Sequence, residues 1–490
     1  MITAQELVDG LLAQPWGQVS PSVYETGRVV SFTPWLTGHE ARVSFLLDSQ
    51  RADGSWGVPD PGYALVPTLS AVEALLGEGP RAAAACERGL AFLRRHLSQP
   101  PPLPDMPAIE MIATSLVRAV NARIGDPLPL PGVLDDGRLE LVEAAFVGGG
   151  PVPDKLWHAL EVLGPKAAGL PHARRERTGT VGASPAATAA WLGRREPDRF
   201  DPARRFLETA VRQHGGPVPV GLPITTFERG WVLGWLARAG LDFAPHPELV
   251  CGLLETLGPD GAPTADGLPP DADTTSVALS ALALLGRPTA PDALWGYETD
   301  THFRTWPGGE DGRSITTNAH VLEAFGTYSR FRPEARYLSA VEKVANWLRE
   351  QQCGEGHWSD RWHASPYYST FCAALSLHEF GGEGAAEAVT RAVRWVLDTQ
   401  REDGSWGIWG GTAEETSYAV QILALTGGVT GRERRAALRS GGRYLLCGGD
   451  GHPALWHDKD LYSPTAIVRA SVLAATHLAG VSDGAEVLTG

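Results

Sequence analysis

The sequence lacks several common features, and each absence excludes a class of protein. None of its apolar runs is long enough to cross a lipid bilayer, so stable insertion into a membrane is not expected. The first residues do not combine a basic start with an apolar stretch, which argues against a secretory signal and favours a cytoplasmic location. The five cysteines lie far apart, without CxxC or zinc-like spacing, so we expect reduced thiols rather than a disulfide or zinc framework.

Positive charge is also scarce. The chain has a net charge of −15 and only four lysines, so nearly all of its positive charge comes from arginine. This balance argues against nucleic acid as a partner, but a few arginines in a pocket can still bind a phosphorylated small molecule. In contrast, the chain is long and rich in apolar residues. Its 490 residues, 43% of them hydrophobic, predict two domains with large cores.

One sequence pattern recurs along the chain. The stretch Leu46-Leu-Asp-Ser-Gln50-Arg-Ala-Asp-Gly-Ser-Trp56-Gly57 returns nearly unchanged as Val396-Leu-Asp-Thr-Gln400-Arg-Glu-Asp-Gly-Ser-Trp406-Gly407. A looser copy runs to Trp358 and uses Gln351, and a degraded one covers residues 206–216. In the clear copies a helix ends, the chain turns at glycine, and the glutamine can bond the open helix end while the indole covers the turn. Such repetition predicts a stacked or toroidal arrangement of helices.

Helix-length apolar stretches, broken by glycine and proline, fill most of the remaining chain, and strand-like alternation is scarce. The sequence therefore predicts an all-α fold of paired helices. Because the stretch 166–200 is rich in Gly, Ala and Arg, we expect the boundary between the two domains there. One domain is expected to comprise residues 1–14 and 200–490, and a smaller inserted domain residues 15–199. The predicted helices after residue 60 cover 65–77, 83–97, 106–121, 185–193, 203–214, 226–239, 275–286, 314–326, 337–351, 367–380, 385–400, 415–426, 434–446 and 464–478.

Several of these helices begin with small hydroxyl residues followed by an apolar face, as in Tyr367-Tyr-Ser-Thr-Phe and Glu414-Glu-Thr-Ser-Tyr. They are interpreted as inner helices whose N-termini open on one end of a barrel. Only one start, Asp271-Ala-Asp273-Thr274-Thr-Ser, carries two aspartates around a single residue. The hydroxyls therefore belong to the scaffold, whereas the carboxylate pair is special to one position. From the motif alone, a helix-capping pair without chemistry is the commoner explanation.

Together, the repeats and the acid pair resemble the class II terpene cyclases, and specifically the bacterial class II diterpene cyclases. The resemblance covers nearly the whole chain: the repeats resemble the QW motifs of that superfamily, and Asp271-x-Asp273-Thr274 resembles its DxDD or DxDT acid motif. It implies two α/α-barrel domains, the βγ didomain, with the acid motif facing a cavity between them. Further segments typical of the family are Ser22-Val-Tyr24-Glu-Thr26, Phe303-Arg304-Thr305, Thr316-Thr-Asn318-Ala-His320, Asp360-Arg361-Trp362-His363, Ala413-Glu414-Glu415-Thr416 and Leu455-Trp456-x-x-Lys459-x-Leu-Tyr462.

The resemblance implies an isomerase or intramolecular lyase that protonates the terminal alkene of geranylgeranyl diphosphate and closes two rings. The product is expected to be a bicyclic copalyl-, labdadienyl- or halimadienyl-type diphosphate. Asp273 takes the role of general acid, and Asp271 shares hydrogen bonds and titrates with it as a pair. Asn318 is expected to hydrogen-bond the acid. Thr274 stands where the commonest form of the motif has aspartate, so the relay around the acid must be built differently.

Two groups of residues are predicted to bind the substrate. Aromatic faces would stabilise the cations, each contact being worth about 0.5–2 kcal/mol, and basic side chains would bind the diphosphate. The resemblance implies Mg²⁺ as cofactor, with unknown ligands. No DDxxD motif is present, so the diphosphate is expected to stay attached and the product to pass to a separate class I terpene synthase or a phosphatase. The predicted residues are Trp306, Trp358, Trp362, Tyr367, Tyr368, Tyr462, Arg304, Arg313, Arg361 and Lys459.

Other functions remain open at this stage. A squalene-hopene-type or a sesquiterpene (drimane-type) class II cyclase would use the same acid, although the short chain disfavours the former. An inverting α-barrel glycosidase would need a second functional carboxylate in a sugar-binding cleft. A helical repeat scaffold without catalytic activity would tolerate Asp273→Asn.

Overall fold

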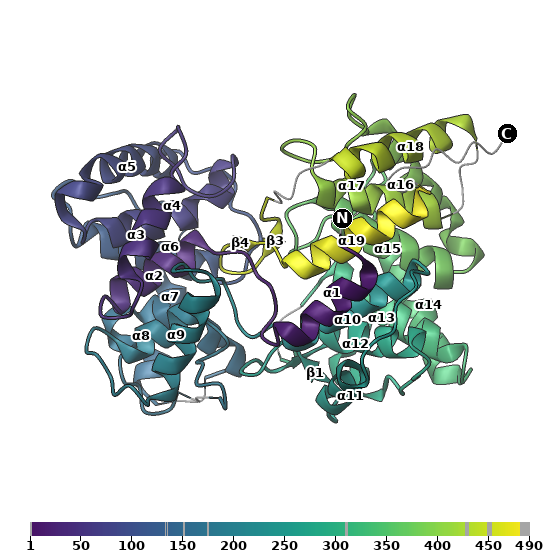
Figure 1. Cartoon of the computed structure of the whole chain (residues 1–490), viewed down its shortest axis with the longest axis horizontal. Coiled ribbons are helices and arrows are strands. Elements are labelled where there is room, and N and C mark those ends of the chain that lie inside the picture. The colour runs from purple at the N-terminus through teal and green to yellow at the C-terminus, as the bar shows by residue number, and fades with distance from the viewer. Residues whose placement is uncertain are drawn as a thin grey trace.

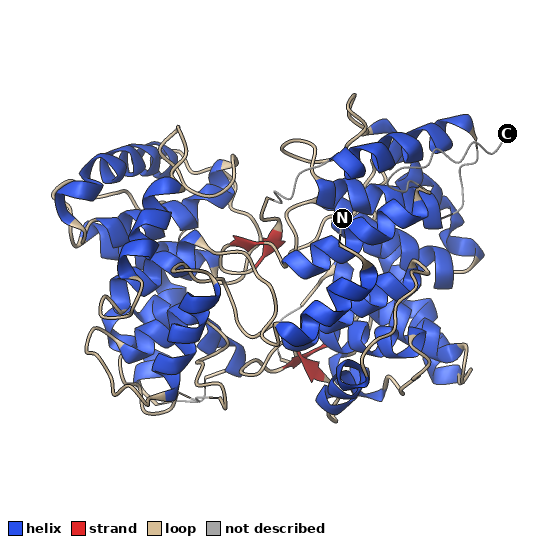
Figure 2. Cartoon of the chain, in the orientation of Figure 1, coloured by secondary structure: helices blue, strands red, loops and turns tan. Residues whose placement is uncertain are grey.

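The protein was analysed as a computed structural model, which describes residues 2–132, 134, 136–149, 152–173, 176–308, 312–426, 431–447 and 453–480. The described residues form helices, with only two short antiparallel hairpins, so the all-α prediction is confirmed (Figure 2). The helices gather into a smaller and a larger body; one hairpin lies between them, and the other lies at the edge of the larger body (Figure 1). Among the described residues, no helix combines the length and apolar character that a bilayer-spanning segment requires.

The smaller body is a ring of helices. Helices α2, α4, α6, η2 and α8 pack each against the next, and α8 packs back on α2, while α3, α5, α7 and α9 lie outside. Its elements are α2 (Val23–Phe32), α3 (His39–Asp48), α4 (Pro61–Leu75), η1 (Gly79–Ala82), α5 (Ala83–Ser98), α6 (Ile109–Asn121), α7 (Asp136–Val147), η2 (Asp154–Ala167), α8 (Pro185–Leu192) and α9 (Pro202–Gln213).

The larger body repeats this plan. Helices α10, α12, α13, α15, α17 and α19 form a closed inner ring, in which α19 packs back on α10. The outer layer includes α1, which packs on α10 and α19 and so brings the N-terminus into this body. Its helices are α1 (Ala4–Ala13), α10 (Thr225–Arg238), α11 (Pro247–Thr256), α12 (Ala272–Leu284), η3 (Asp292–Tyr297), α13 (Ile315–Ser329), α14 (Ala335–Glu350), α15 (Pro366–Phe380), η4 (Glu383–Ala385), α16 (Ala386–Asp398), α17 (Ala413–Leu425), α18 (Arg432–Cys447) and α19 (Thr465–Leu478).

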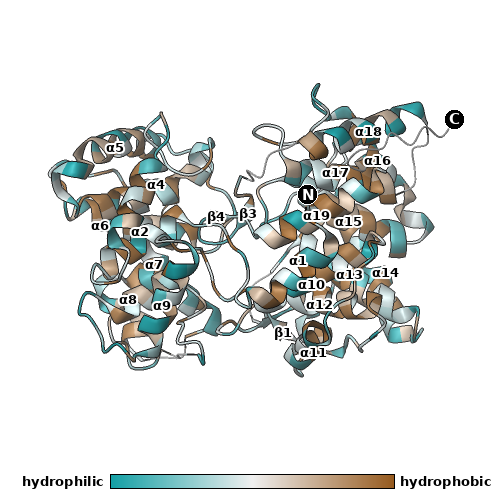
Figure 3. Cartoon of the chain, viewed as in Figure 1, coloured by the Kyte–Doolittle hydropathy of each residue, from teal (hydrophilic) through white to brown (hydrophobic). Residues whose placement is uncertain are grey.

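The inner helices are buried on nearly every face, whereas outer helices such as α9 and α16 bury a single stripe. Figure 3 shows brown, apolar segments on inner helices such as α15. The two hairpins pair β1 (Ala262–Pro263) with β2 (Pro270–Asp271), and β3 (Trp456–His457) with β4 (Leu461–Tyr462). Helix α9 packs on α8, and its Phe206 and Leu207 belong to the same apolar core as Trp231 of α10, so the domain boundary at residues 199 and 200 stays a prediction.

The repeated glutamines and tryptophans brace the helix ends. Trp56 Nε1 donates to Leu46 O (2.6 Å), and Trp406 Nε1 donates to Val396 O (2.7 Å). Gln400 Nε2 bonds Gly404 O in the turn and Ala437 O at the next outer helix. The backbone N–H of each tryptophan donates to a hydroxyl near the start of an inner helix, which explains the hydroxyl pattern: the acceptors are Thr68, Thr370 and Thr416. In the third copy the bracing glutamine is Gln352, not Gln351 as the sequence predicted.

Candidate active site

The acid motif occupies the first turn of α12. Asp271 is the N-cap, and its Oδ1 accepts the backbone N–H of Thr274 at 2.6 Å, as short polar residues commonly do at this position. Its Oδ2 accepts the Thr264 hydroxyl at 3.1 Å. Burial, and then the charge of Asp273, raise the pKa of Asp271 to about 7. The pair therefore retains a proton near neutral pH.

Asp273 lies two residues further along in the same first turn and is the member of the pair that remains partly open. Its side chain is 17% exposed and lines the main cavity. Its Oδ1 lies 2.7 Å from His320 Nδ1 on α13. Burial alone would lower the pKa of His320, but the Asp273 charge, together with Cys372 and the hydrogen bonds to both side chains, outweighs burial and raises that pKa well above its ordinary value. His320 is therefore an imidazolium that donates to one oxygen of Asp273 and leaves the other facing the cavity.

The prediction that Asn318 hydrogen-bonds the acid is wrong. Its amide oxygen accepts the N–H of Phe303, and its amide nitrogen donates to the carbonyls of Phe303 and Ser314. Asn318 thus holds the loop before α13, and His320, two positions later, reaches the acid. Sequence reasoning had quoted His320 within the same segment without giving it a role. The signal that could have identified His320 as a partner of the acid was its ionisable side chain, two positions after Asn318 on the same helix.

Thr274 is part of a chain of hydrogen-bonded hydroxyl groups. Thr274 Oγ1 lies 2.9 Å from Thr264 Oγ1, and Thr264 in turn bonds Asp271. Thr264, Thr274 and Thr316 all line the cavity. Hydroxyl groups can both donate and accept, so this chain can pass a proton between Asp271 and the cavity. Hydroxyl groups thus occupy the place where the commonest form of the motif has a third carboxylate.

The cavity has a volume of about 980 Å³ and lies where the two bodies meet. That volume is at the upper end of the range for small-molecule sites. Aromatic side chains line it near the acid: the Trp456 ring lies 4.6 Å from Tyr368 and 5.6 Å from Phe227. Neither Trp456 nor Phe227 was predicted. The predicted residues that line the cavity are Trp306, Trp362, Tyr368, Tyr462, Arg313, Arg361 and Lys459.

Three predicted binding residues do not line it. Trp358 is fully buried as the third repeat's brace, and its Nε1 donates to the carbonyl of Leu348 at 2.8 Å. Tyr367 packs on Trp395 of the outer layer, with ring centroids 4.6 Å apart. The Arg304 guanidinium donates to the carbonyl of Gly308 in its own loop. Tyr367 and Arg304 each lie next to a cavity residue in sequence but point another way, because successive side chains on a helix or loop face different directions.

Basic groups line the side of the cavity contributed mainly by the smaller body. Arg138 of α7 pairs with Glu110 at 2.8 Å, and Arg361 of the larger body pairs with Asp105 at 3.2 Å. Lys155 of η2 lines the same space. Because these ion pairs are largely exposed to solvent, they are weak and can be exchanged for a ligand.

Two further groups complete the lining. The indole N–H of Trp362 is buried at the cavity and has no hydrogen-bond partner among the described residues. Lys459 also borders the cavity, but its ammonium is bound to Glu25 and Glu161 at 2.5 and 2.7 Å. Among the described residues there is no group of three or more His, Cys, Asp or Glu side chains that could hold a metal ion.

The chain is similar to known proteins over nearly its whole length. Residues 310–446 match the family described as squalene-hopene cyclase C-terminal domain. The chain is 43% identical to ent-copalyl diphosphate synthase of Streptomyces sp. (strain KO-3988), over 96% of this chain and 94% of that protein. It is 42% identical to labda-7,13-dienyl diphosphate synthase of Streptomyces clavuligerus, over 96% and 91%. The structure of ent-copalyl diphosphate synthase from Streptomyces platensis superimposes with a TM-score of 0.92 at 42% identity, covering 98% of this chain and 99% of that one.

Proposed function

The chain belongs to the bacterial class II diterpene cyclases of the copalyl and labdadienyl diphosphate synthase type, and on that premise we propose which bonds it makes and which residues act. The substrate is geranylgeranyl diphosphate. Asp273 gives its proton to the terminal alkene, two carbon–carbon bonds form in succession, and a proton leaves the final cation. The product is a bicyclic diphosphate of copalyl, labdadienyl or halimadienyl type.

The observation that carries this proposal is the environment of Asp273. A weakly basic alkene requires a strong acid that is still protonated before reaction. The shared proton of the aspartate pair supplies the protonated form, because Asp271 and Asp273 lie too close for both to ionise readily. The His320 imidazolium supplies the acid strength, because its charge stabilises the carboxylate that remains after proton transfer.

The cavity wall supports the later steps. Tyr368, Tyr462 and Trp456 line the cavity near the acid, and their ring faces can stabilise carbocations by about 0.5–2 kcal/mol each. Trp306 and Trp362 are assigned the same role further along the wall. An apolar enclosure also keeps water from the cations, which would otherwise be trapped as alcohols.

The diphosphate is placed against Arg138, Lys155 and Arg361, with Arg313 as a further contact and Trp362 donating its free N–H. Mg²⁺ commonly keeps several waters and joins one or two carboxylates to substrate phosphates. Asp105 and Glu110 line this side of the cavity and fit that pattern, although the described residues hold no ready-made metal cluster. When bound, Mg²⁺ would neutralise diphosphate charge and hold its orientation.

The chain has no DDxxD motif, so the product keeps its diphosphate and passes to a separate class I synthase or phosphatase in the cytoplasm. The runner-up substrates are farnesyl diphosphate, as in a drimane-type cyclase, and squalene. The test is to incubate the purified protein with farnesyl, geranylgeranyl and geranylfarnesyl diphosphates plus Mg²⁺, with and without phosphatase, and to analyse the extract by mass spectrometry. A bicyclic C20 alcohol that appears only after phosphatase treatment supports the proposal. Conversion of the C15 diphosphate alone, or hydrocarbon released without phosphatase, contradicts it.

A further inference from the structure

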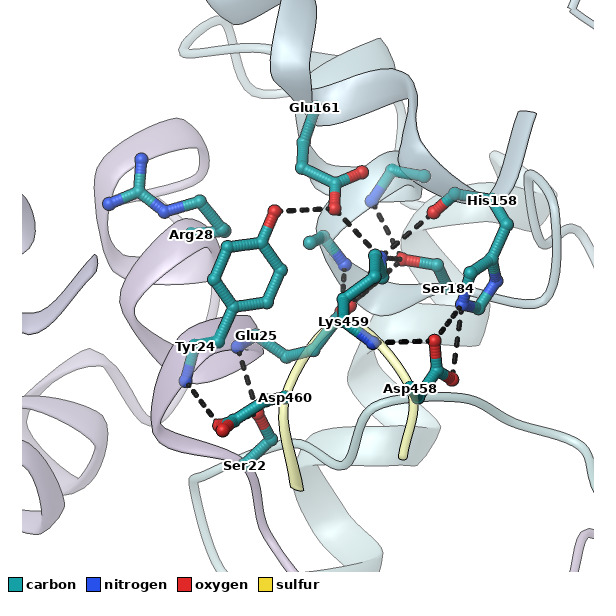
Figure 4. A network of polar contacts seen from close by, with 12 residues as sticks. Ser22, Tyr24, Glu25, Arg28, His158, Glu161, Ser184, Asp458, Lys459 and Asp460 are labelled. Atoms are coloured by element: carbon teal, nitrogen blue, oxygen red, sulfur yellow. Dashed lines mark hydrogen bonds and ion pairs between the residues drawn. The ribbon is translucent and has the colours of Figure 1, made fainter. Parts of the chain in front are cut away.

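The β3–β4 hairpin reaches from one body into the other. At its base, Trp456 lines the cavity, and its Nε1 donates to Glu414 Oε1 of α17 at 2.7 Å. Tyr462, at the other side of the base, lines the cavity too. The tip, Asp458-Lys459-Asp460, is inserted among helices of the smaller body (Figure 4). The hairpin thus places two cavity aromatics while its tip is held elsewhere.

The Lys459 side chain is the centre of that attachment and is completely buried. Its Nζ lies 2.5 Å from Glu25 Oε1 of α2 and 2.7 Å from Glu161 Oε1 of η2. It also donates to the Ser184 hydroxyl at the start of α8 (2.7 Å) and to the His158 carbonyl (2.8 Å). One ammonium therefore joins the hairpin to three helices of the smaller ring.

The two flanking aspartates fix the tip as well. Asp458 Oδ1 lies 2.9 Å from His158 Nε2, and Asp460 Oδ2 accepts the Ser22 hydroxyl at 2.8 Å and the Tyr24 N–H at 3.1 Å (Figure 4). The other ring nitrogen of His158 faces the carbonyl of Gly182 at 2.6 Å, so both nitrogens face acceptors and the ring is an imidazolium. Three consecutive residues thus make buried polar contacts with the smaller body.

We propose that Lys459 is a positioning residue: by clamping the hairpin tip to the smaller body, it sets where Trp456 and Tyr462 stand in the cavity wall, and thereby how the polyene folds before the rings close. This inference rests on the proposed function and replaces the predicted role of Lys459 as a diphosphate ligand. The ammonium has three protons and four acceptors within 2.8 Å, so none is left for a phosphate.

The clamp bears on the chemistry because ring closure depends on the substrate's fold. Misplacing reacting groups by about 1 Å can cost about a hundredfold in rate. The wall near the acid is a packed aromatic cluster, in which Trp456 also contacts His363 at 5.3 Å. If the hairpin shifts, both aromatics shift with it, and the cations meet different faces and different proton acceptors.

The charge balance around Lys459 determines how the inference is tested. Glu161 Oε2 is buried and has no hydrogen-bond partner in the part of the chain that the structure describes, and burial raises the pKa of Glu25 to about 7 even beside Lys459. Removing the ammonium alone would strand two buried carboxylates, which is strongly destabilising. The variant of choice is therefore Lys459→Met combined with Glu161→Gln. The amide oxygen introduced by Glu161→Gln can still accept the hydrogen bond from the Tyr24 hydroxyl. Glu25 can become neutral by taking up a proton.

The experiment compares products and rates of Lys459→Met/Glu161→Gln with those of the wild-type protein, which must first convert geranylgeranyl diphosphate. Lys343→Met is the control, because Lys343 pairs with Glu298 of the larger body and does not border the cavity. The double variant is expected to lower kcat by about tenfold to a hundredfold, with KM within about threefold, and to give a mixture of monocyclic and alternative bicyclic alcohols after dephosphorylation. The control is expected to give the wild-type product at the wild-type rate.

Wild-type product at the wild-type rate from the double variant overturns the clamp, and so does a raised KM with unchanged kcat, which would indicate a phosphate ligand. If the double variant does not fold, Asp458→Asn decides, since it loosens the tip from His158 and leaves Lys459 in place. A product mixture from Asp458→Asn supports the proposal, and a single wild-type product contradicts it. If the wild-type protein converts no C20 diphosphate, the proposed function is wrong and the clamp is not the cause. The two failures can therefore be distinguished.

Discussion

At the scale of single residues, Asp271 and Asp273 are chemically identical and differ only in their surroundings. Both carboxylate oxygens of Asp271 accept hydrogen bonds, one from the backbone at the start of α12 and one from Thr264. In Asp273, one oxygen contacts His320 and the other is open to the cavity. Asp273→Asn is therefore expected to lower kcat by about a thousandfold or more, since a general acid typically contributes about 10²–10⁴-fold. Thermal unfolding followed by circular dichroism is expected to be unchanged, because Asp271 still caps α12. More than a tenth of wild-type activity would contradict the assignment.

The pH dependence follows from the shared proton. Because burial and the Asp273 charge raise the pKa of Asp271 to about 7, Asp271 holds its proton below that pH and loses it above. We expect kcat to be highest on the acid side and to fall as pH rises through about 7. In His320→Gln the loss of the imidazolium is expected to shift this fall to higher pH and to lower kcat by about tenfold or more. His302→Gln, at a buried histidine stacked on Trp347, is the control. Overlapping pH profiles for wild type and His320→Gln would refute the role of His320.

The residue scale also shows the limit of prediction from sequence. The acid motif could be found because two aspartates stood at one of several equivalent helix starts. Asn318 and His320 could not be distinguished, because two positions along a helix change the direction of a side chain by about 200° and only packing decides which faces the acid. Lys459 borders the cavity as predicted, but its contacts with Glu25 and Glu161 could not be predicted, since these carboxylates lie hundreds of residues away in sequence.

At the scale of elements, helix existence and the braces followed from periodicity and repetition. The inner ring is the exception, because its helices are apolar on every side and periodicity does not tell which neighbours they meet. The domain boundary near residue 200 stays a prediction for a related reason: α9 has a strong apolar stripe, but the stripe alone does not tell which domain it packs on.

The third brace offers a matched test at this scale. Gln352 Nε2 bonds Gly356 O at 2.7 Å and Ala388 O at 2.9 Å, whereas Gln351, next to it, is exposed. Gln352→Ala is expected to lower the free energy of unfolding by about 1–3 kcal/mol, as two hydrogen bonds are lost. Gln351→Ala is expected to change it by less than about 0.5 kcal/mol. Urea unfolding monitored by fluorescence measures both, and product identity is expected to stay the same. Equal effects would show that the glutamine does not act as a brace.

At the scale of the whole molecule, the cavity forms because the two rings of helices meet beside the β3–β4 hairpin. No local pattern in the sequence shows which residues of the smaller body line it, and Arg138 and Lys155 were accordingly missed. The larger body carries the acid and most of the aromatic wall, whereas both bodies contribute basic side chains to the proposed diphosphate site: Arg138 and Lys155 from the smaller body, Arg313 and Arg361 from the larger. These basic groups gather in one cavity although the chain as a whole carries −15.

This arrangement predicts that binding and chemistry can be separated by mutation. Arg138→Gln combined with Arg361→Gln is expected to raise KM for the prenyl diphosphate by about tenfold or more, because each guanidinium–phosphate contact is charge-assisted and worth about 1.5–3 kcal/mol. Since both residues lie away from Asp273, kcat is expected to change by less than about threefold. Arg394→Gln, at a surface arginine that pairs with Glu433, is the control. Steady-state kinetics at two salt concentrations provide the measurement, and the wild-type KM is expected to rise with salt while that of the double variant rises less. If kcat falls and KM does not, the two arginines act on the chemistry instead, and the diphosphate must bind elsewhere in the cavity.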